Sequence, residues 1–372
     1  MGSYRDFGTN AAHSLGGVVT GSTTARQATS VTSTYTDTLL QSVLNAGADR
    51  VGVTTADPLV RAKAALESRI AAGFADNMQF TFRNPERSTT PTMSVPGARS
   101  IIVAARSYWS QTPSESTTGD RIAARVARYA WRDHYEPLRE ALRVAAKQLR
   151  SDGHRATVFA DDNSIVDREV AWRAGLGWYG KNANLLLEGL GSWFVLGCVV
   201  TTAELVSTER EVADGCGACR RCIDACPTGA IVAPGVVDAR KCLAWLLQKP
   251  GTFDPAHRAA LGTRIYGCDD CQEVCPPSRR GAINRTHGDE RAVVDALELL
   301  TSPDDVVLAI VGEWYVADRN PRWVKRNALL VLGNAGVVND DVISVLARYV
   351  HGDDAILREH AEWAAHQLDV CV

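Results

Sequence analysis

Two cysteine runs decide the fold at the centre of this 372-residue chain: C-G-A-C-R-R-C-I-D-A-C-P at residues 216–227 and C-D-D-C-Q-E-V-C-P at residues 268–276. The first run has the spacing Cys-x2-Cys-x2-Cys-x3-Cys-Pro, which binds cubane iron–sulfur clusters in bacterial proteins. The second run is the same pattern without its first cysteine, since position 265 is an isoleucine. Cys242 lies between the runs and brings the count to eight.

Eight cysteines are enough for two [4Fe–4S] clusters, because each cluster needs four thiolates around a compact core. In this pattern three closely spaced cysteines hold one cluster, and the cysteine before the proline reaches the other. The pattern therefore predicts one cluster on Cys216, Cys219, Cys222 and Cys275, and a second on Cys226, Cys242, Cys268 and Cys271. A zinc ribbon or disulfides are the alternatives, but zinc favours separated Cys-x2-Cys pairs without the Cys-Pro ending. Cys198 and Cys371 are expected to be plain thiols.

The composition, with 45% hydrophobic and 22% charged residues, is typical of a soluble globular protein. No apolar run is long enough to span a bilayer, so no membrane partner is expected. Residues 1–35 lack the apolar core of a signal peptide and are expected to form a disordered lead. The thiolate-rich centre predicts a reducing, cytoplasmic location. The net charge is −3, and residues 281–372 hold 8 Lys or Arg against 15 Asp or Glu, so any polyanion site must be a local patch.

Helical and strand patterns alternate before the cysteine runs and predict an α/β (α+β) domain over residues 36–205. The expected strands cover 48–56, 98–109 and 155–160, the expected helices cover 36–46, 57–74, 120–151 and 167–175, and a hairpin over 182–202 turns near 188–191. A ferredoxin-like two-cluster domain is expected over 206–282. The tail, 283–372, is helical in pattern, with 322–336 and 357–368 as the inner helices of two successive repeats.

The segment F-A-D-D-N-S-I-V-D-R-E-V-A-W-R-A-G-L-G-W-Y-G-K-N (159–182) is the candidate place where electrons are used. Its acidic residues follow a strand, and a carboxylic acid at a strand end can donate a proton to a reduced substrate. The turn with Gly177 and Gly180 lets the backbone approach a flat cofactor closely. The alternative is a capped helix and an ordinary loop, with Asp167 as a charge at the helix N-terminus.

Four stretches carry a more specific pattern: P-G-A-R-S-I-I-V (96–103), D-R-E-V-A-W-R-A-G-L-G-W-Y-G-K-N (167–182), G-S-W-F-V-L-G (191–197) and Y-G-C-D-D-C-Q-E-V-C-P (266–276). With R-N-A-L-L-V-L-G-N-A-G (326–336) in the tail, they resemble the epoxyqueuosine reductase family of queuosine biosynthesis. Ferredoxins share only the cysteine pattern, so the combination is specific. The resemblance covers roughly residues 36 to 372.

The resemblance implies a cobalamin-binding catalytic domain, a two-cluster domain and a HEAT-like tail. It also implies the reaction, a two-electron removal of the epoxide oxygen of epoxyqueuosine in a tRNA anticodon stem-loop. Electrons would pass from a flavodoxin or ferredoxin through the clusters to base-off cobalamin. Ungapped alignment through D-R-E-V-A places the family's proton-donating aspartate at Asp161, with Asp162 as the fallback. Cofactor contacts are expected at Gly177, Trp178, Gly180, Lys181 and Asn182.

The chain departs from the family in segments that are expected to face the substrate. The segment Y-A-W-R-D-H-Y-E (129–136) is one residue shorter than its family counterpart and lacks the histidine that ends the family's Asp-Tyr-His. Three other departures are A-D-D-N (160–163), L-A-W-L-L-Q-K-P-G (243–251) and P-P-S (276–278). In the acidic tail, the expected tRNA contacts are the basic residues Arg319, Arg322, Lys325 and Arg326, with a solvated helix face as the alternative.

Three hypotheses of function follow. The leading one is an epoxyqueuosine reductase that acts on tRNA. The second is a cobalamin-dependent reductase of a small molecule, such as a halogenated compound or another epoxide, which the departures and the acidic tail favour. The third is an electron-transfer protein without a reaction of its own, whose first domain docks a partner.

Overall fold

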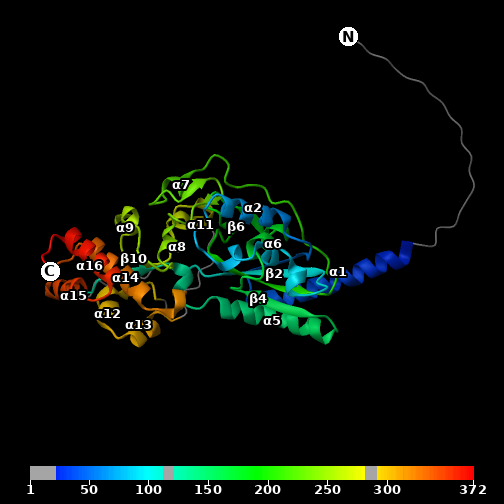
Figure 1. The fold of residues 1–372 in the computed structure, drawn as a ribbon. Coiled ribbons are helices and arrows are strands. Elements are labelled where there is room, and N and C mark those ends of the chain that lie inside the picture. Colours follow the sequence, from blue (N-terminus) through cyan, green and yellow to red (C-terminus); the bar gives the residue numbers. More distant parts are fainter. Residues whose placement is uncertain (1–21, 112–120, 281–290, 313) are drawn as a thin grey trace, which may run out of the picture.

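The structure is a computed structural model that describes residues 22–111, 121–280, 291–312 and 314–372 (Figure 1). A four-stranded sheet forms the centre of the first half of the chain. Its strand order is β1 (Arg50–Thr55), β2 (Ser100–Ser107), β7 (Phe194–Thr201) and β4 (Ala156–Ala160). All three pairings are antiparallel. The mixed helix and strand content is therefore confirmed, in its α+β form.

Helices cover both faces of this sheet. On one face lie α1 (Ser22–Asn45) and α5 (Tyr135–Ser151), and on the other lie α2 (Val60–Ala71), α6 (Asp167–Arg173) and the hairpin β5 (Gly177–Tyr179) with β6 (Leu185–Leu187). Because side chains alternate along a strand, Ile102 of β2 packs into the first layer and Ile101 into the second. Both faces are buried, which explains why the strand sequences are almost continuously apolar.

After α2, three short elements lead from β1 to β2, and the first of them contacts Trp245 and Tyr315 through Phe80. They are η1 (Phe80–Phe82), α3 (Pro85–Thr89) and α4 (Pro91–Ser94). Proline opens both helices, where its missing N–H would have no helical partner. The Asn84 side chain caps α3 by accepting a hydrogen bond from the Arg87 N–H (3.1 Å).

The first helix begins earlier than the sequence predicts. Residues 22–35, expected in a disordered lead, form the first part of α1, and residues 1–21 lie outside the described residues. Further along the helix, Leu39 and Val43 are buried in the core shared with α5, and the Tyr35 hydroxyl donates to Asp152 at the end of α5 (2.6 Å).

The predicted hairpin over residues 182–202 is wrong in its pairing. Strand β6 pairs with β5, which precedes it, whereas β7 lies between β2 and β4. Since both edges of β7 are occupied, β6 has no edge of β7 to pair with. The turn is where it was expected, with Gly189 and Gly191 at positive φ and a single bridge between Leu187 and Gly191.

The predicted helix over residues 120–151 begins only at Tyr135. Residues Ala123–Val126 form strand β3, which pairs with β10 (Arg264–Tyr266) and β11 (Val293–Asp295). Ile122, Ala124 and Val126 are buried in the core of the C-terminal part, while the residues between them are exposed. This alternation is that of a strand with one buried face. The segment therefore belongs to the C-terminal core and not to the predicted domain over 36–205.

The cysteine-rich part has little regular structure. Its elements are α7 (Arg221–Asp224), the pair β8 (Ile231–Ala233) and β9 (Val236–Val237), α8 (Leu243–Leu246), α9 (Pro255–Leu261), α10 (Asp270–Glu273) and α11 (Pro276–Arg280). The tail consists of α12 (Ala296–Thr301), α13 (Asp304–Val311), η3 (Ala317–Arg319), α14 (Arg322–Ala335), α15 (Asp340–Val350) and α16 (Ala355–Leu368).

The two helices that were expected inside the tail, α14 and α16, pack against each other in the C-terminal core. The boundary predicted at residue 282 lies outside the described residues. Across the part of the chain that the structure describes, no helix combines the length and the apolarity that crossing a membrane would need.

Candidate active site

The two cysteine runs meet in space. In the first run the Cys216 carbonyl accepts a hydrogen bond from the Cys219 N–H (2.9 Å), and α7 carries Cys222. In the second run α10 carries Cys271, and the Cys275 N–H donates to the Gln272 carbonyl (3.1 Å). Helices α7 and α10 contact each other. The two runs therefore lie side by side.

The first predicted set of four thiols is brought together. Burial raises the pKa of Cys222, and the neighbouring thiols of Cys275, Cys216 and Cys219 raise it further. Burial also raises the pKa of Cys275, which has Cys216 and Cys219 as its thiol neighbours. Cys222 and Cys275 are buried, whereas Cys216 and Cys219 are half-buried. This set therefore lies near the surface.

The second predicted set is brought together as well. Burial raises the pKa of Cys242, with Cys226 as its neighbouring thiol. Burial raises the pKa of Cys268 to about 12, with Cys242 among its neighbours, and it raises the pKa of Cys271, next to Cys268 and Cys242. The Cys222 thiol also raises the pKa of Cys271, so the two sets are neighbours.

The donor set fits iron–sulfur clusters. Within the described ranges, no group of three or more His, Cys, Asp or Glu side chains could hold a single metal ion. Eight thiols in two neighbouring sets are the donor type and number that two [4Fe–4S] clusters require. Cys198 lies buried in β7 and Cys371 is exposed near the C-terminus, and neither is among the thiols that act on the two sets.

Residues 177–182, the predicted cofactor contacts, join the sheet domain to the cysteine runs. The Lys181 ammonium donates to the Gly217 carbonyl beside Cys216 (2.6 Å). The buried Asn182 amide donates to the Cys271 carbonyl (3.3 Å) and its oxygen accepts from the Asn184 N–H (3.2 Å). One segment of the first domain is therefore bonded to both runs.

The two glycines of this segment are explained by the neighbouring strand. A Cβ atom at Gly177 would lie 2.1 Å from the Leu186 carbonyl oxygen, and one at Gly180 would lie 2.9 Å from the Leu186 side chain. Glycine is needed because β5 and β6 approach so closely. Trp178 differs from its neighbours, since its indole N–H is buried and has no hydrogen-bond partner among the described residues.

Asp161 stands at the end of β4, where the strand turns towards α6. Its φ of 55° is in the left-handed region, which few residues other than glycine adopt. Its side chain is accessible, but desolvation by the surrounding atoms raises its pKa. Arg139 lowers this pKa, while Asp133 and Asp162 raise it. The net increase favours the protonated acid that a proton donor requires.

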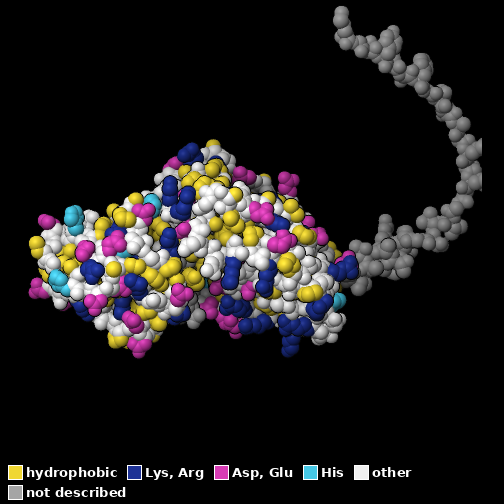
Figure 2. All heavy atoms as spheres, in the orientation of Figure 1, with side chains coloured by type: hydrophobic (Ala, Val, Ile, Leu, Met, Phe, Trp, Pro, Cys, Tyr) yellow, Lys and Arg dark blue, Asp and Glu magenta, His cyan; other side chains and the backbone are white. Residues whose placement is uncertain are grey.

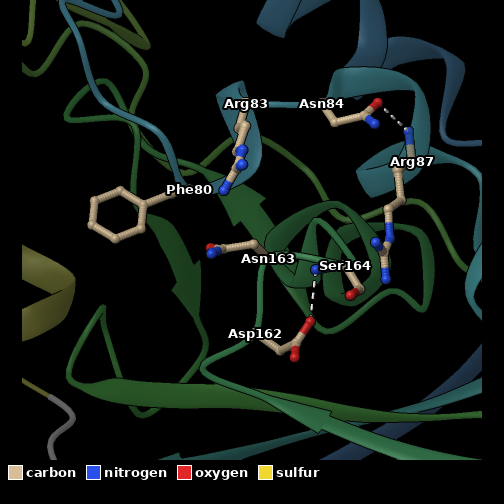
Figure 3. Close-up of a pocket in the computed structure, with 7 residues that line it drawn as sticks. All are labelled: Phe80, Arg83, Asn84, Arg87, Asp162, Asn163 and Ser164. Atoms are coloured by element: carbon tan, nitrogen blue, oxygen red, sulfur yellow. Dashed lines mark hydrogen bonds between the residues drawn. The ribbon is translucent and has the colours of Figure 1, made fainter.

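Asp162 is the next residue of this loop. One of its carboxylate oxygens accepts a hydrogen bond from the Ser164 N–H (2.7 Å), and the side chain lines a cavity of about 520 Å³ (Figure 3). Its carboxylate is thus used in part to shape the turn. Asp167 opens α6, as the alternative interpretation expected, and its pKa is raised by burial.

Tyr135 is a candidate site residue that sequence reasoning missed. It is the first residue of α5, and burial raises its pKa, with Asp161 and Asp167 as the next causes. The tyrosine therefore lies beside both carboxyl groups. It belongs to the divergent segment 129–136, so the departure from the family pattern was the signal that could have found it. Its neighbour His134 is buried, and burial lowers the pKa of that imidazole to about 4.

The structure corrects the predicted tRNA patch. Arg326 is fully buried and donates to main-chain carbonyls of the cysteine-rich part, so it cannot reach a phosphate group. Arg322 pairs with Asp354 (2.5 Å) and Lys325 pairs with Asp304 (2.6 Å). On the face in Figure 2, acidic and basic side chains are interspersed over the tail. Arg319 lies in η3, ahead of the helix, and donates to the Gly312 and Trp314 carbonyls. Burial removes Arg326 from the predicted patch, and the other three cations already have partners within the tail.

Comparison with known proteins agrees with this geometry. A family model described as a 4Fe-4S double cluster binding domain matches residues 215–278, and one described as epoxyqueuosine reductase QueG, DUF1730, matches residues 89–162. An epoxyqueuosine reductase of Xanthomonas campestris pv. campestris is 34% identical over 337 residues, which cover 87% of this chain and 93% of the relative. The chain belongs to the epoxyqueuosine reductase family.

Solved structures support this membership. A crystal structure of an epoxyqueuosine reductase with an epoxyqueuosine-modified tRNA-Tyr stem loop matches with a TM-score of 0.83 and 28% identity, over 91% of each chain. A Bacillus subtilis epoxyqueuosine reductase, whose catalytic loop is swung out of the active site, matches with the same values. Membership in this reductase family makes the chain an oxidoreductase and sets aside its interpretation as an electron-transfer protein without a reaction of its own.

Proposed function

We propose that this protein reduces epoxyqueuosine to queuosine in tRNA. The observation that carries the proposal is the match to epoxyqueuosine reductases along most of the chain, which spans the sheet domain, the cysteine runs and the tail. The overall reaction takes up two electrons and two protons, breaks both epoxide C–O bonds, forms the alkene and releases the oxygen as water. The chain must therefore deliver single electrons and place at least one proton donor.

We assign the two clusters to the two sets of neighbouring thiols. Cys216, Cys219, Cys222 and Cys275 would hold one cluster, and Cys226, Cys242, Cys268 and Cys271 the other. An external donor such as a flavodoxin or ferredoxin would then deliver electrons at the half-buried Cys216 and Cys219. When bound, the clusters supply electrons one at a time, and cobalamin supplies a cobalt centre that such electrons reduce.

Asp161 is the proposed proton donor. Its raised pKa keeps the carboxyl group protonated at a higher pH than an ordinary aspartate, and its position at a strand end leaves it accessible. Asp162, the fallback, is the weaker candidate because its carboxylate accepts the Ser164 N–H. Tyr135 lies beside Asp161 and would position it. The left-handed backbone at Asp161 is suited to a loop that changes conformation, as the catalytic loop of the Bacillus subtilis relative does.

Cobalamin remains part of the proposal, but residues 177–182 fit it poorly as a set. The glycines accommodate Leu186, while Lys181 and Asn182 bind the cysteine runs. Trp178 keeps a buried indole N–H that is free to meet a bound group, in the part of the chain described. We therefore derive no step through cobalamin from this segment and retain Trp178 alone as a candidate contact.

The remaining assignments complete the proposal. The helices α13 to α16 would form a HEAT-like domain that contributes to tRNA binding. The domain division over 36–205, 206–282 and 283–372 is kept with one change, since β3 is part of the C-terminal core. We expect the protein to act in the cytoplasm, where thiolate-rich clusters stay reduced.

The proposal is tested with anaerobically reconstituted protein, cobalamin, a reductant and an epoxyqueuosine-containing tRNA stem-loop. The product, analysed as nucleosides by mass spectrometry, should be queuosine. The matched control is Asp161→Asn, which keeps the shape of the site and removes the proton. Absence of queuosine from fully metallated, cobalamin-loaded wild-type protein would overturn the proposal.

A further inference from the structure

The cavity beside Asp161 has no role in the chemistry described so far. Its walls come from two segments, the turn around η1 and α3 and the loop between β4 and α6 (Figure 3). The lining residues are Phe80, Arg83, Asn84, Arg87, Asp162, Asn163 and Ser164. Its volume of about 520 Å³ lies within the range of about 300–1,000 Å³ found for small-molecule sites.

Two arginines at this cavity are left without acidic partners. Within the described residues, neither the Arg83 nor the Arg87 guanidinium forms an ion pair or a hydrogen bond. Neighbouring arginines differ: Arg61 binds Glu169, and Arg139 binds Glu136 and the Ala160 carbonyl. The cavity therefore presents two cations whose binding capacity is unused.

The lining favours an anion. Asp162 is the single acidic lining residue, and one of its oxygens already accepts the Ser164 N–H, so the lining carries one net positive charge. Figure 3 shows the Arg83 side chain directed towards Asn163 and the Arg87 side chain towards Ser164. Guanidinium groups match the paired oxygens of a phosphate, and the amide of Asn163 can add a hydrogen bond. A phosphodiester is the chemical class that these donors fit.

The position of the cavity connects it to the reaction. Asn163 is two residues from Asp161, so their Cα atoms are at most about 7.6 Å apart. On another side the Phe80 ring meets the edges of Trp245 (6.0 Å between centroids) and Tyr315 (5.1 Å). The Tyr315 side chain is 45% exposed. An exposed aromatic ring next to a phosphate site is the combination that binds single-stranded RNA by stacking.

We propose that Arg83, Asn84, Arg87 and Asn163, here called the arginine pocket, bind a phosphodiester group of the RNA strand beside the nucleotide that reacts at Asp161. The inference rests on the proposed function, because it takes the substrate to be RNA. The nucleotide tail of cobalamin also carries a phosphodiester. The exposed Tyr315 beside the pocket favours RNA, and the experiment separates the two sources.

The test compares the cluster-loaded full-length protein with the double variant Arg83→Gln/Arg87→Gln. Binding of an anticodon stem-loop RNA is followed by fluorescence anisotropy over a series of salt concentrations. We expect roughly tenfold weaker binding, because two charge-assisted contacts to phosphate oxygens are lost. The plot of the logarithm of the association constant against the logarithm of the salt concentration has a negative slope. The magnitude of this slope should decrease by about 1.4 in the double variant, because each phosphate contact to a single strand contributes about 0.7. Lys147→Gln, on the exposed face of α5, removes one charge elsewhere and should change neither value.

Two further measurements separate loss of charge from loss of arginine geometry, and RNA binding from cobalamin binding. Arg83→Lys/Arg87→Lys keeps both charges and should restore the salt slope while recovering only part of the affinity. Cobalamin uptake, followed in the visible spectrum, should be the same for all variants. Unchanged RNA binding by the double glutamine variant would overturn the inference, and so would weakened cobalamin uptake. Failure of the proposed function is seen separately, as the inability of the wild-type protein to convert an epoxyqueuosine stem-loop.

Discussion

Arg326 gives the sharpest test of how the tail is attached to the rest of the protein. Its guanidinium is fully buried and donates to the main-chain carbonyls of Lys249 (2.8 Å), Gly251 (2.7 Å) and Leu246 (3.1 Å). These three residues follow Cys242, a proposed cluster ligand, in sequence. Arg326 on α14 therefore ties the tail to the cysteine-rich part by charge-assisted hydrogen bonds.

The size of the effect of Arg326→Met follows from these contacts. Methionine fills much of the space of the arginine stem, but it leaves three buried carbonyls without their donor. Each such carbonyl costs about 1–3 kcal/mol. The substitution also removes the cost of burying the guanidinium charge, which offsets part of this sum. That cost is visible in the pKa of Arg326, which burial lowers to about 9. A net loss of about 3–5 kcal/mol results, which is typical of removing one partner from a buried charged network.

Thermal unfolding of cluster-loaded protein, followed by circular dichroism under anaerobic conditions, measures this loss. At about 2–4 °C per kcal/mol, Arg326→Met should lower Tm by about 6–20 °C. Arg322→Met is the matched control, because the half-buried pair of Arg322 with Asp354 contributes only about 1 kcal/mol or less. If Arg326→Met keeps the wild-type Tm but weakens RNA binding below the transition, the structural role assigned to Arg326 is refuted.

Three further predictions concern the site. Asp161→Asn should lower the rate of queuosine formation by about 10²–10⁴-fold, with RNA binding unchanged. The wild-type rate should fall as the pH rises through the raised pKa of Asp161, because the donor is then deprotonated, and the pH profile of the variant should lack this fall. Cys275→Ala and Cys242→Ala should each abolish a different cluster signal in electron paramagnetic resonance; loss of the same signal in both would contradict the assignment. Gly177→Ala should lower the free energy of unfolding by about 3 kcal/mol even without cobalamin, since the added Cβ would meet the Leu186 carbonyl. An unchanged Tm with impaired cobalamin uptake would instead favour a cofactor role for Gly177.

The elements that sequence predicted well are those whose signal is local. The cysteine spacings predicted two sets of thiols because Cys216, Cys219 and Cys222 of one set are close in sequence, as are Cys268 and Cys271 of the other. The helices α14 and α16 were predicted because apolar residues recur at helical spacing on both. The strands β1, β2 and β4 were predicted because each is a short apolar segment bounded by turns.

The errors concern information that is not local. The alternation of Ile122, Ala124 and Val126 is a strand pattern, but nothing near it in sequence says that its partners are β10 and β11, more than a hundred residues away. The hairpin error has the same origin, since only the sheet order shows that both edges of β7 are taken. Arg326 looked like a surface cation because burial of a charged residue depends on carbonyls supplied by another part of the chain.

Strand β3 and the residues Lys181 and Asn182 connect the sheet domain to the later parts of the chain, and they explain how the cysteine runs are held near the candidate reaction site. The sheet domain sends β3 into the C-terminal core, and it binds both cysteine runs through Lys181 and Asn182. Electron transfer to a substrate needs a fixed spacing between the thiols and the site, and a single linker between domains would allow that spacing to vary. Two separate crossings constrain the relative motion far more than one. The pairing of β3 in the C-terminal core and the hydrogen bond from Asn182 to the Cys271 carbonyl therefore both hold the sheet domain against the cysteine-rich part.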